Sequence, residues 1–253
     1  AVELTNKKMS EIKIAINGAG ASSISCARLF VSFGANPDNI LMCDSKGVIY
    51  KGRDGLNKQK EEFAVETECR TLADTLVGAD VFIGLSIGDV VSKEMVLTMA
   101  ENPIIFAMAN PDPEISPKDA FEARQDIIMA TGRADYPNQV NNVLGFPFIF
   151  RGALDVAATD INEEMKVAAA ESLSKLAKLG AGPEIAARHN RKELVYGKEY
   201  IVPSPFDPRV LVWESYAVAK AAIETGVARI KIDLDEYKAK LEKMAGVEPQ
   251  DFS

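Results

Sequence analysis

Short apolar runs alternate with polar and amphipathic stretches through the first half of the chain. Five runs are almost wholly apolar, and they cover residues 12–17, 40–44, 80–85, 103–108 and 126–130. Runs of this kind are typical of strands that are buried on both faces of a parallel sheet. The alternation of strands with helical patterns predicts an α/β fold with a doubly wound, mostly parallel Rossmann-type sheet and helices on both faces.

Capping residues mark where several helices between these strands begin. Thr71 is followed three residues later by Asp74, which is the arrangement of a capping box. Ser92 is expected to cap the next helix, and Ser116 followed by Pro117 gives a further helix start. The other elements expected in this half are helices over 22–33 and 58–64 and, over 45–53, a small hairpin or an extended excursion.

Beyond residue 133 the strand pattern stops. A polar loop over 136–147 leads into apolar and small residues up to 159, to which we assign no element. Extra C-terminal helices are expected over 163–179, 209–224 and 234–244, with an exposed polar stretch over 180–200 and an extended stretch over 200–208. We therefore expect one domain over 1–253, with its core over 12–133 and a loop and helical extension over 134–253.

The first strand runs into a glycine turn and then a helix, which is the context of a dinucleotide-binding fingerprint. Gly18 permits the tight turn, and Gly20 lets the backbone approach a pyrophosphate that the helix N-terminus attracts. The third small position of the fingerprint is Ser23, so the pattern is G-x-G-x-x-S. The predicted cofactor contacts are Gly18, Ala19, Gly20, Ala21, Ser22 and Ser23. The alternative is a simple turn in another doubly wound protein.

Polar side chains also follow other predicted strands, where doubly wound sheets bind their ligands. Asp44 lies 24 residues after Gly20, near the spacing at which an acid meets the adenosine ribose. Ser86 and Asn110 stand at two further strand ends, and both are candidate cofactor contacts. For Asn110, an Asx turn before Pro111 is an equally good explanation.

Composition and charge narrow the class of protein. The net charge is −8 and no basic stripe is present, which argues against a nucleic-acid partner. No apolar stretch approaches the ~20 residues of a membrane span. The three cysteines are odd in number and form no C-x-x-C pair, so we expect reduced cysteines in a cytoplasmic protein. No metal-ligand spacing and no triad of nucleophile, histidine and acid is present, so we expect binding of a cofactor without a catalytic residue.

Several longer motifs point to a known family. They are N-G-A-G-A at 17–21, C-D-S-K-G-V-I-Y-x-G-R at 43–53, A-N-P-D-P-E-I at 109–115, T-G-R-x-D-Y-P-N-Q-V-N-N-V-L-G-F-P at 131–147, R-G-A-L-D at 151–155 and P-F-D-P-R at 205–209. In order and spacing, from the start to about residue 230, the chain resembles the C-terminal, NAD(P)-binding half of the bacterial-type malic enzymes.

The resemblance implies an activity and a role for individual residues. Malic enzymes oxidatively decarboxylate malate to pyruvate and carbon dioxide, with NAD or NADP and with Mg²⁺ or Mn²⁺. By this resemblance the glycine turn binds the pyrophosphate, Asp44 approaches the adenosine ribose and Asn110 contacts the nicotinamide side. Asn142, with Asn141 beside it, contacts the malate carboxylate. Without the resemblance, a role in capping the local backbone is the favoured explanation for these two amides.

The resemblance also implies what the chain needs from elsewhere. In the family, the tyrosine acid, the lysine base and the acidic metal ligands lie upstream of the fingerprint, so no catalytic acid, base or metal ligand is assigned to this chain. We expect an N-terminal catalytic domain as its partner and a homodimer through the apolar C-terminal helices. The cofactor stays open between NAD, which Asp44 favours, and NADP, which Ser45 and Lys46 favour. The alternatives are a free-standing NAD(P)-binding regulatory module and a domain of an amino- or hydroxy-acid dehydrogenase.

Overall fold

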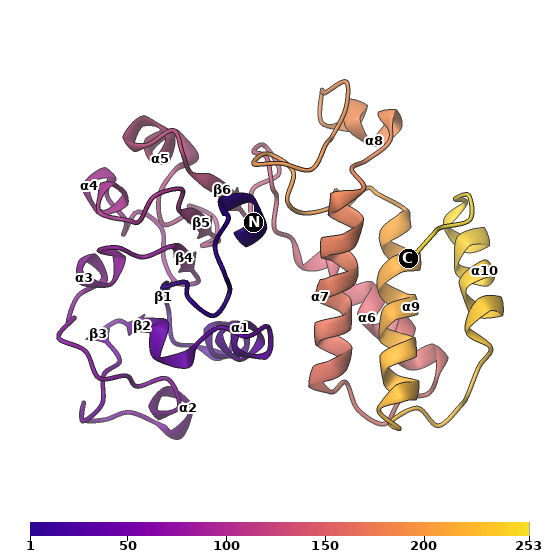
Figure 1. The fold of residues 1–253 in the computed structure, drawn as a ribbon, viewed down its shortest axis with the longest axis horizontal. Coiled ribbons are helices and arrows are strands. Elements are labelled where there is room, and N and C mark those ends of the chain that lie inside the picture. The colour runs from indigo at the N-terminus through magenta and orange to yellow at the C-terminus, as the bar shows by residue number, and fades with distance from the viewer. Residues whose placement is uncertain (253) are drawn as a thin grey trace. The chain divides into compact units, whose positions relative to one another are not determined.

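The structure, a computed structural model, describes residues 1–252. The chain divides into two compact units, which we call the sheet unit, Ala1–Gln139, and the helical unit, Val140–Ser253 (Figure 1). The sheet unit contains every predicted strand, and the helical unit contains the predicted C-terminal helices.

The sheet unit is built on a six-stranded sheet with the order β3-β2-β1-β4-β5-β6. All neighbouring strands are parallel except β3, which pairs antiparallel with β2. The strands are β1 (Ile14–Asn17), β2 (Ile40–Asp44), β3 (Gly47–Val48), β4 (Val81–Gly84), β5 (Ile104–Ala107) and β6 (Ile128–Thr131). The prediction of a doubly wound, mostly parallel sheet is confirmed. Of the two alternatives for 45–53, the hairpin is present, because β3 pairs with the end of β2.

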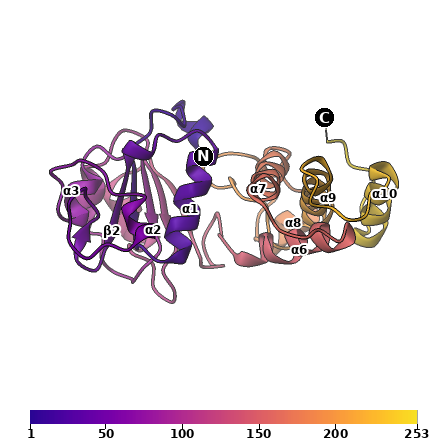
Figure 2. The ribbon, with the colours of Figure 1, turned by 90° about the horizontal axis from the view of Figure 1, so that it is seen from below.

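Helices cover both faces of this sheet. They are α1 (Ala21–Ser32), α2 (Lys58–Glu61), α3 (Leu72–Leu76), α4 (Lys93–Leu97) and α5 (Pro117–Ala123), with short 3₁₀ helices η1 (Val2–Thr5) and η2 (Pro37–Asn39). Figure 2 shows α1 and α3 on opposite faces. Alternate strand residues such as Phe82 and Ile105 pack with Leu76, Val96 and Ala120 from α3, α4 and α5, which gives that face a continuous core.

The predicted helix starts in the sheet unit are confirmed. The Thr71 side chain accepts a hydrogen bond from the Asp74 N–H, and the Asp74 carboxylate accepts one from the Thr71 N–H. The Ser92 hydroxyl accepts the Met95 N–H at the start of α4, and the Ser116 hydroxyl accepts the Asp119 N–H at the start of α5. These contacts satisfy N–H groups that have no partner inside the helix.

The helical unit is organised around α9 (Arg209–Glu224), which packs against α6 (Phe146–Asp155), α7 (Glu163–Lys178) and α10 (Leu234–Ala245). Figure 1 shows α7, α9 and α10 side by side. A Cβ added to Gly152 of α6 would lie 2.5 Å from the carbonyl oxygen of Ser215. Glycine at this position therefore allows α6 and α9 to cross closely. The three predicted C-terminal helices are confirmed.

Two features of the helical unit differ from the expectations. Residues 148–159, to which we assigned no element, contribute most of α6, because Pro147 fits the first turn and begins a helix there. The stretch 180–200 is not uniformly exposed, because it contains α8 (Pro183–Arg188) and a small core. That core consists of Ala186, Leu194 and Tyr200. A third short helix, η3 (Asn142–Leu144), lies within the expected polar loop.

Candidate dinucleotide site at the strand ends

The turn after β1 requires a glycine at its first position. Gly18 has a φ of +116°, a conformation that residues with a side chain rarely adopt. A Cβ here would lie 2.7 Å from the carbonyl oxygen of Leu85 and 3.0 Å from Oγ of Ser23. The Gly18 N–H donates to the carbonyl oxygen of Cys43 at 2.9 Å, which ties the turn to the end of β2. Gly18 is therefore a requirement of the fold itself.

Gly20 has no such structural reason to be glycine. Its φ is −87°, and a Cβ added here would meet nothing within 4 Å among residues 1–252. It is exposed and stands at the N-terminus of α1, where no side chain of the described chain caps the helix. The start of α1 thus lacks a side-chain cap, in contrast to the capped starts of α3, α4 and α5. An anion fits this arrangement.

The other fingerprint residues divide by exposure. Ala21 and Ser22 are exposed, and Ala19 is half-buried. Ser23 is fully buried against Gly18, and its Oγ has no hydrogen-bond partner in the part of the chain that the structure describes. The Ser23 side chain therefore supports close packing of helix on strand. Cofactor contact by these residues stays a prediction.

Asp44, at the end of β2, is the centre of an ion cluster. Its carboxylate oxygens accept two hydrogen bonds from the Arg53 guanidinium, at 2.7 and 2.8 Å, and one from the Lys60 ammonium at 2.6 Å. The backbone N–H of Lys46 donates a further one at 2.9 Å. Arg53 also donates to the carbonyl oxygens of Gly47 and Val48, so the cluster fixes the β2–β3 hairpin.

The side chains of Asp44, Arg53 and Lys60 together carry a net positive charge. Burial of the Asp44 side chain opposes its ionisation, but hydrogen bonds from Lys60 and Arg53 outweigh burial and lower its pKa to about 2. Two cations therefore offset one carboxylate, and Ser45 and Lys46 stand exposed beside them. The acid that would repel a 2′-phosphate is already neutralised, which the sequence alone does not reveal.

The loops after β4 and β5 are joined by a residue that the sequence analysis missed. Ser86 and Asn110 are both exposed, and Nδ2 of Asn17 donates to Oγ of Ser86 at 2.7 Å. Between the loops lies Glu114, whose carboxyl oxygens accept the N–H groups of Ser86 and Ala109 at 3.1 and 3.0 Å. The only sequence signal for Glu114 is an acid placed directly before the apolar Ile115 within the motif at 109–115.

The two adjacent asparagines of the helical unit differ in their contacts. Oδ1 of Asn141 accepts the Val143 N–H at 3.0 Å and caps η3, which is the local role that competed with substrate binding. Asn142 is exposed and lines an open hollow with Val143, Gly145 and Phe146. Substrate contact by either residue stays a prediction.

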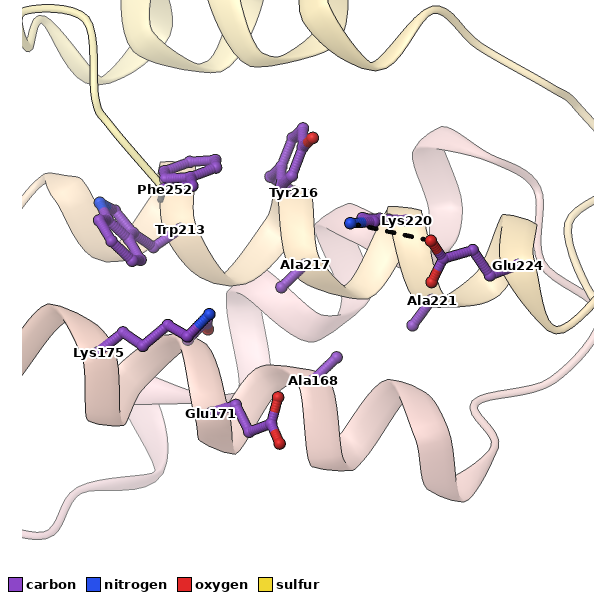
Figure 3. Close-up of a pocket in the computed structure, with 11 residues that line it drawn as sticks. Ala168, Glu171, Lys175, Trp213, Tyr216, Ala217, Lys220, Ala221, Glu224 and Phe252 are labelled. Atoms are coloured by element: carbon purple, nitrogen blue, oxygen red, sulfur yellow. Dashed lines mark ion pairs between the residues drawn. The ribbon is translucent and has the colours of Figure 1, made fainter.

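A second hollow, of about 240 Å³, lies between α7 and α9 (Figure 3). Ala168, Ala217 and Ala221 line it together with the aromatic rings of Trp213 and Tyr216. Glu171 and Lys175 lie on its α7 side, and on the α9 side Lys220 pairs with Glu224 at 3.8 Å. It holds no residue of the predicted site.

Two kinds of feature are absent from the described residues. Over residues 1–252, no group of three or more His, Cys, Asp or Glu side chains is placed to hold a metal ion. Within the same residues, no helix is both long enough and apolar enough to cross a bilayer.

Comparison with known proteins identifies the family. A family model described as "Malic enzyme, NAD binding domain" matches residues 1–184. The NADP-dependent malic enzyme of Rhizobium meliloti (strain 1021) is 56% identical over 243 residues, which are 95% of this chain and 32% of that enzyme. The NAD-dependent malic enzyme of the same organism is 48% identical over 244 residues, 96% of this chain and 32% of that enzyme.

A solved structure agrees with the sequence comparisons. The crystal structure of Entamoeba histolytica malic enzyme matches with a TM-score of 0.83 and 36% identity, covering 96% of this chain and 50% of that chain. The chain thus spans about a third of the length of the two Rhizobium relatives. It belongs to the malic enzyme family and corresponds to the NAD-binding domain of that family.

Proposed function

We propose that this chain binds NADP at the strand ends of the sheet unit and serves as the cofactor-binding part of a malic enzyme. The observation that supports this most directly is the uncapped N-terminus of α1 beside Gly20, where the fold leaves an open space that it does not itself need. A pyrophosphate fits that space, because the N–H groups and the helix dipole attract an anion and glycine lets it approach.

The preference for NADP over NAD rests on the cluster at the end of β2. The Asp44 carboxylate is engaged by Arg53 and Lys60, so its charge does not oppose a 2′-phosphate. The exposed Lys46 ammonium and Ser45 hydroxyl supply a charge and a donor for that phosphate. The relative named as NADP-dependent is also more similar to this chain than the one named as NAD-dependent, at 56% against 48% identity.

The reaction would be the oxidative decarboxylation of malate. When bound, NADP⁺ would supply the acceptor for the hydride of malate C2, and the resulting ketone would lose the β-carboxylate as carbon dioxide. The residues of this chain bind and orient: the α1 N-terminus holds the pyrophosphate, Asn110 contacts the nicotinamide side, and Asn142 contacts the malate carboxylate. As the family resemblance implies, an N-terminal catalytic domain would supply the acid, the base and the ligands of the divalent metal.

The remaining features of the proposal concern assembly and compartment. We infer a homodimer, because large apolar side chains such as Phe146, Phe150 and Leu154 are exposed along α6. We place the protein in the cytoplasm, because Cys26, Cys43 and Cys69 are all free.

Calorimetric titration of the 253-residue chain with NADP⁺ and with NAD⁺ tests the proposal. We expect saturable binding of NADP⁺ and weaker binding of NAD⁺. Lys46→Ala should weaken NADP⁺ binding about tenfold and leave NAD⁺ binding unchanged, because it removes one charge-assisted contact to the 2′-phosphate.

Lys51→Ala provides the matched control, since Lys51 is an exposed lysine in the same part of the chain. It should change neither affinity. Equal affinities of the unmodified chain for the two dinucleotides would refute the preference for NADP, and a lack of binding to either would refute the cofactor site.

A further inference from the structure

The two loops that follow β4 and β5 are held together by one buried carboxyl group. Glu114 has an exposed fraction of 0%. Its Oε1 accepts the Ser86 N–H at 3.1 Å, and its Oε2 accepts the Ala109 N–H at 3.0 Å. Ser86 is an exposed residue of the β4 loop, and Ala109 directly precedes Asn110 in the β5 loop. Movement of the carboxyl group would therefore change the position of both loops.

Backbone contacts place the segment around Glu114 against the β4 loop. The Asp89 N–H donates to the Pro113 carbonyl oxygen at 3.1 Å, and the Val91 N–H donates to the Glu114 carbonyl oxygen at 2.9 Å. A Cβ at Gly88 would lie 2.6 Å from the carbonyl oxygen of Asp112. The two loops thus form one hydrogen-bonded structure. The Glu114 side chain adds the bonds to the N–H groups of Ser86 and Ala109.

The end of β4 is adapted to this carboxyl group. Gly84, the last residue of β4, is buried, and a Cβ there would collide with all three atoms of the Glu114 carboxyl group. Glycine at this position therefore makes the space in which the carboxyl group lies. Gly84 is not in the left-handed region of φ, so its role here is the space and not the backbone conformation.

The order of the strands indicates which part of a dinucleotide these loops face. In this fold a dinucleotide lies across the strand ends, with one half on each side of the position where the strand order reverses. β1 is flanked by β2 on one side and β4 on the other, with β5 beyond β4. Because Asp44 ends β2 on the adenosine side, the loops after β4 and β5 lie on the nicotinamide side.

We propose that Glu114 is a positioning residue, which fixes the loops of Ser86 and Asn110 so that they hold the nicotinamide half of the dinucleotide. This inference rests on the proposed function, because it requires a dinucleotide at the strand ends. Glu114 itself is buried and does not touch the cofactor. It acts through the hydrogen bonds that it accepts from two backbone N–H groups. Loss of its carboxylate should therefore weaken binding of the nicotinamide half and leave binding of the adenosine half unchanged.

Glu114→Gln is the sharpest test, because the two side chains have nearly the same shape. The glutamine carbonyl oxygen can accept one N–H group, but its amide nitrogen would face the other N–H group, donor against donor. We expect NADP⁺ to bind about tenfold more weakly, because a buried N–H group loses its partner and the loop around it shifts. Adenosine 2′,5′-bisphosphate, which lacks the nicotinamide half, should bind within about twofold of its original affinity.

A second variant reaches the same carboxyl group from the other side. Gly84→Ala should reproduce the selective loss of NADP⁺ affinity, since the added methyl group displaces the Glu114 side chain. In the double variant the two effects should not add, because both act through one group. Glu101→Gln, at an exposed glutamate of the same unit, is the control and should change neither affinity.

The outcomes separate this inference from the proposed function. Selective loss of NADP⁺ affinity, with the bisphosphate unaffected, supports the positioning role. Unchanged NADP⁺ affinity, or equal weakening of both ligands, overturns the positioning role and leaves the proposed NADP site intact. If the unmodified chain binds neither ligand, the proposed function fails, and the positioning role fails with it.

Discussion

Each unit of the molecule contains a fully buried glutamate, and the two have opposite surroundings. Glu114 in the sheet unit and Glu214 on α9 of the helical unit both have an exposed fraction of 0%. Glu114 accepts two backbone N–H groups. For Glu214, neither carboxyl oxygen has a hydrogen-bond partner in the described part of the chain, and burial raises its pKa to about 9.

The difference shows that burial alone does not define the role of an acidic side chain. At the strand ends, Glu114 satisfies backbone groups of two loops and so gives them a defined position. In the helical unit, Glu214 makes no polar contact that would offset its transfer from water, so it keeps its proton at neutral pH. Glu114 is therefore expected to stabilise the sheet unit, whereas Glu214 is expected to destabilise the helical unit as the pH rises.

The largest expected effect is on Glu214. Between its unfolded pKa, near 4.5, and its folded pKa, about 9, the folded state keeps a proton that the unfolded state has released, so stability falls as the pH rises. Glu214→Gln removes this dependence. At pH 8 we expect it to raise the free energy of unfolding by on the order of 3–5 kcal/mol, and at pH 4.5 by about zero. Urea denaturation of both proteins across this pH range measures the difference, and parallel pH profiles would contradict the prediction.

The same substitution at Glu114 should change the free energy of unfolding in the opposite direction. Glu114→Gln leaves one buried N–H group without an acceptor, and we expect it to lower the free energy of unfolding by about 2–3 kcal/mol at pH 7. The same denaturation experiment measures this loss. A stabilised Glu114 variant would remove the contrast between the two glutamates.

The two glycines of the turn after β1 also differ in their importance for the fold: Gly18 is required by the backbone conformation, and Gly20 is not. Gly18→Ala should lower the free energy of unfolding by about 2 kcal/mol, because a side chain there is strained and lies against Leu85. Gly20→Ala should leave stability within about 0.5 kcal/mol, since its methyl group would meet no atom of residues 1–252 within 4 Å, and it should weaken NADP⁺ binding. Thermal melts with and without NADP⁺ distinguish the two. A destabilised Gly20 variant that still binds NADP⁺ would show that this glycine serves the fold.

The smallest effect on stability is expected at Ser23, whose buried hydroxyl, unlike the Glu114 carboxyl group, has no hydrogen-bond partner among the described residues. Its buried Oγ lacks a partner within residues 1–252, so Ser23→Ala should raise the free energy of unfolding by up to about 1 kcal/mol. Dinucleotide binding should not change, because the hydroxyl faces the packed side of the turn. Reduced affinity in this variant would show that the hydroxyl reaches the ligand after all.

The sequence predicted the sheet well because its strands are buried on both faces. Such strands appear as short apolar runs, and the caps at Thr71, Ser92 and Ser116 separate them from the helices that follow. It predicted α6 and α8 poorly. On α6 the exposed side chains include Phe146 and Leu154, whereas the buried residues are the small Gly152 and Ala153, so large apolar side chains do not mark the buried face there.

In the candidate site, too, the sequence predicted some features and missed others. The fingerprint and the strand-end position of Asp44 are local features, and the sequence contains them. The partners of Asp44 are not local, because Arg53 and Lys60 return to it from 9 and 16 residues further along the chain. Glu214 does have a sequence signal, since it stands four residues from both Val210 and Val218 on the buried face of α9.

The ion cluster at Asp44 has a consequence for the engineering of cofactor choice. The acid at the end of the second strand is an obvious residue to exchange when the preference between NAD and NADP is redesigned. Here that exchange would leave two cations without their common partner and would release the hairpin that they fix. Library design for altered cofactor use should therefore keep Asp44 and vary the exposed residues Ser45 and Lys46, where a change does not dismantle the scaffold.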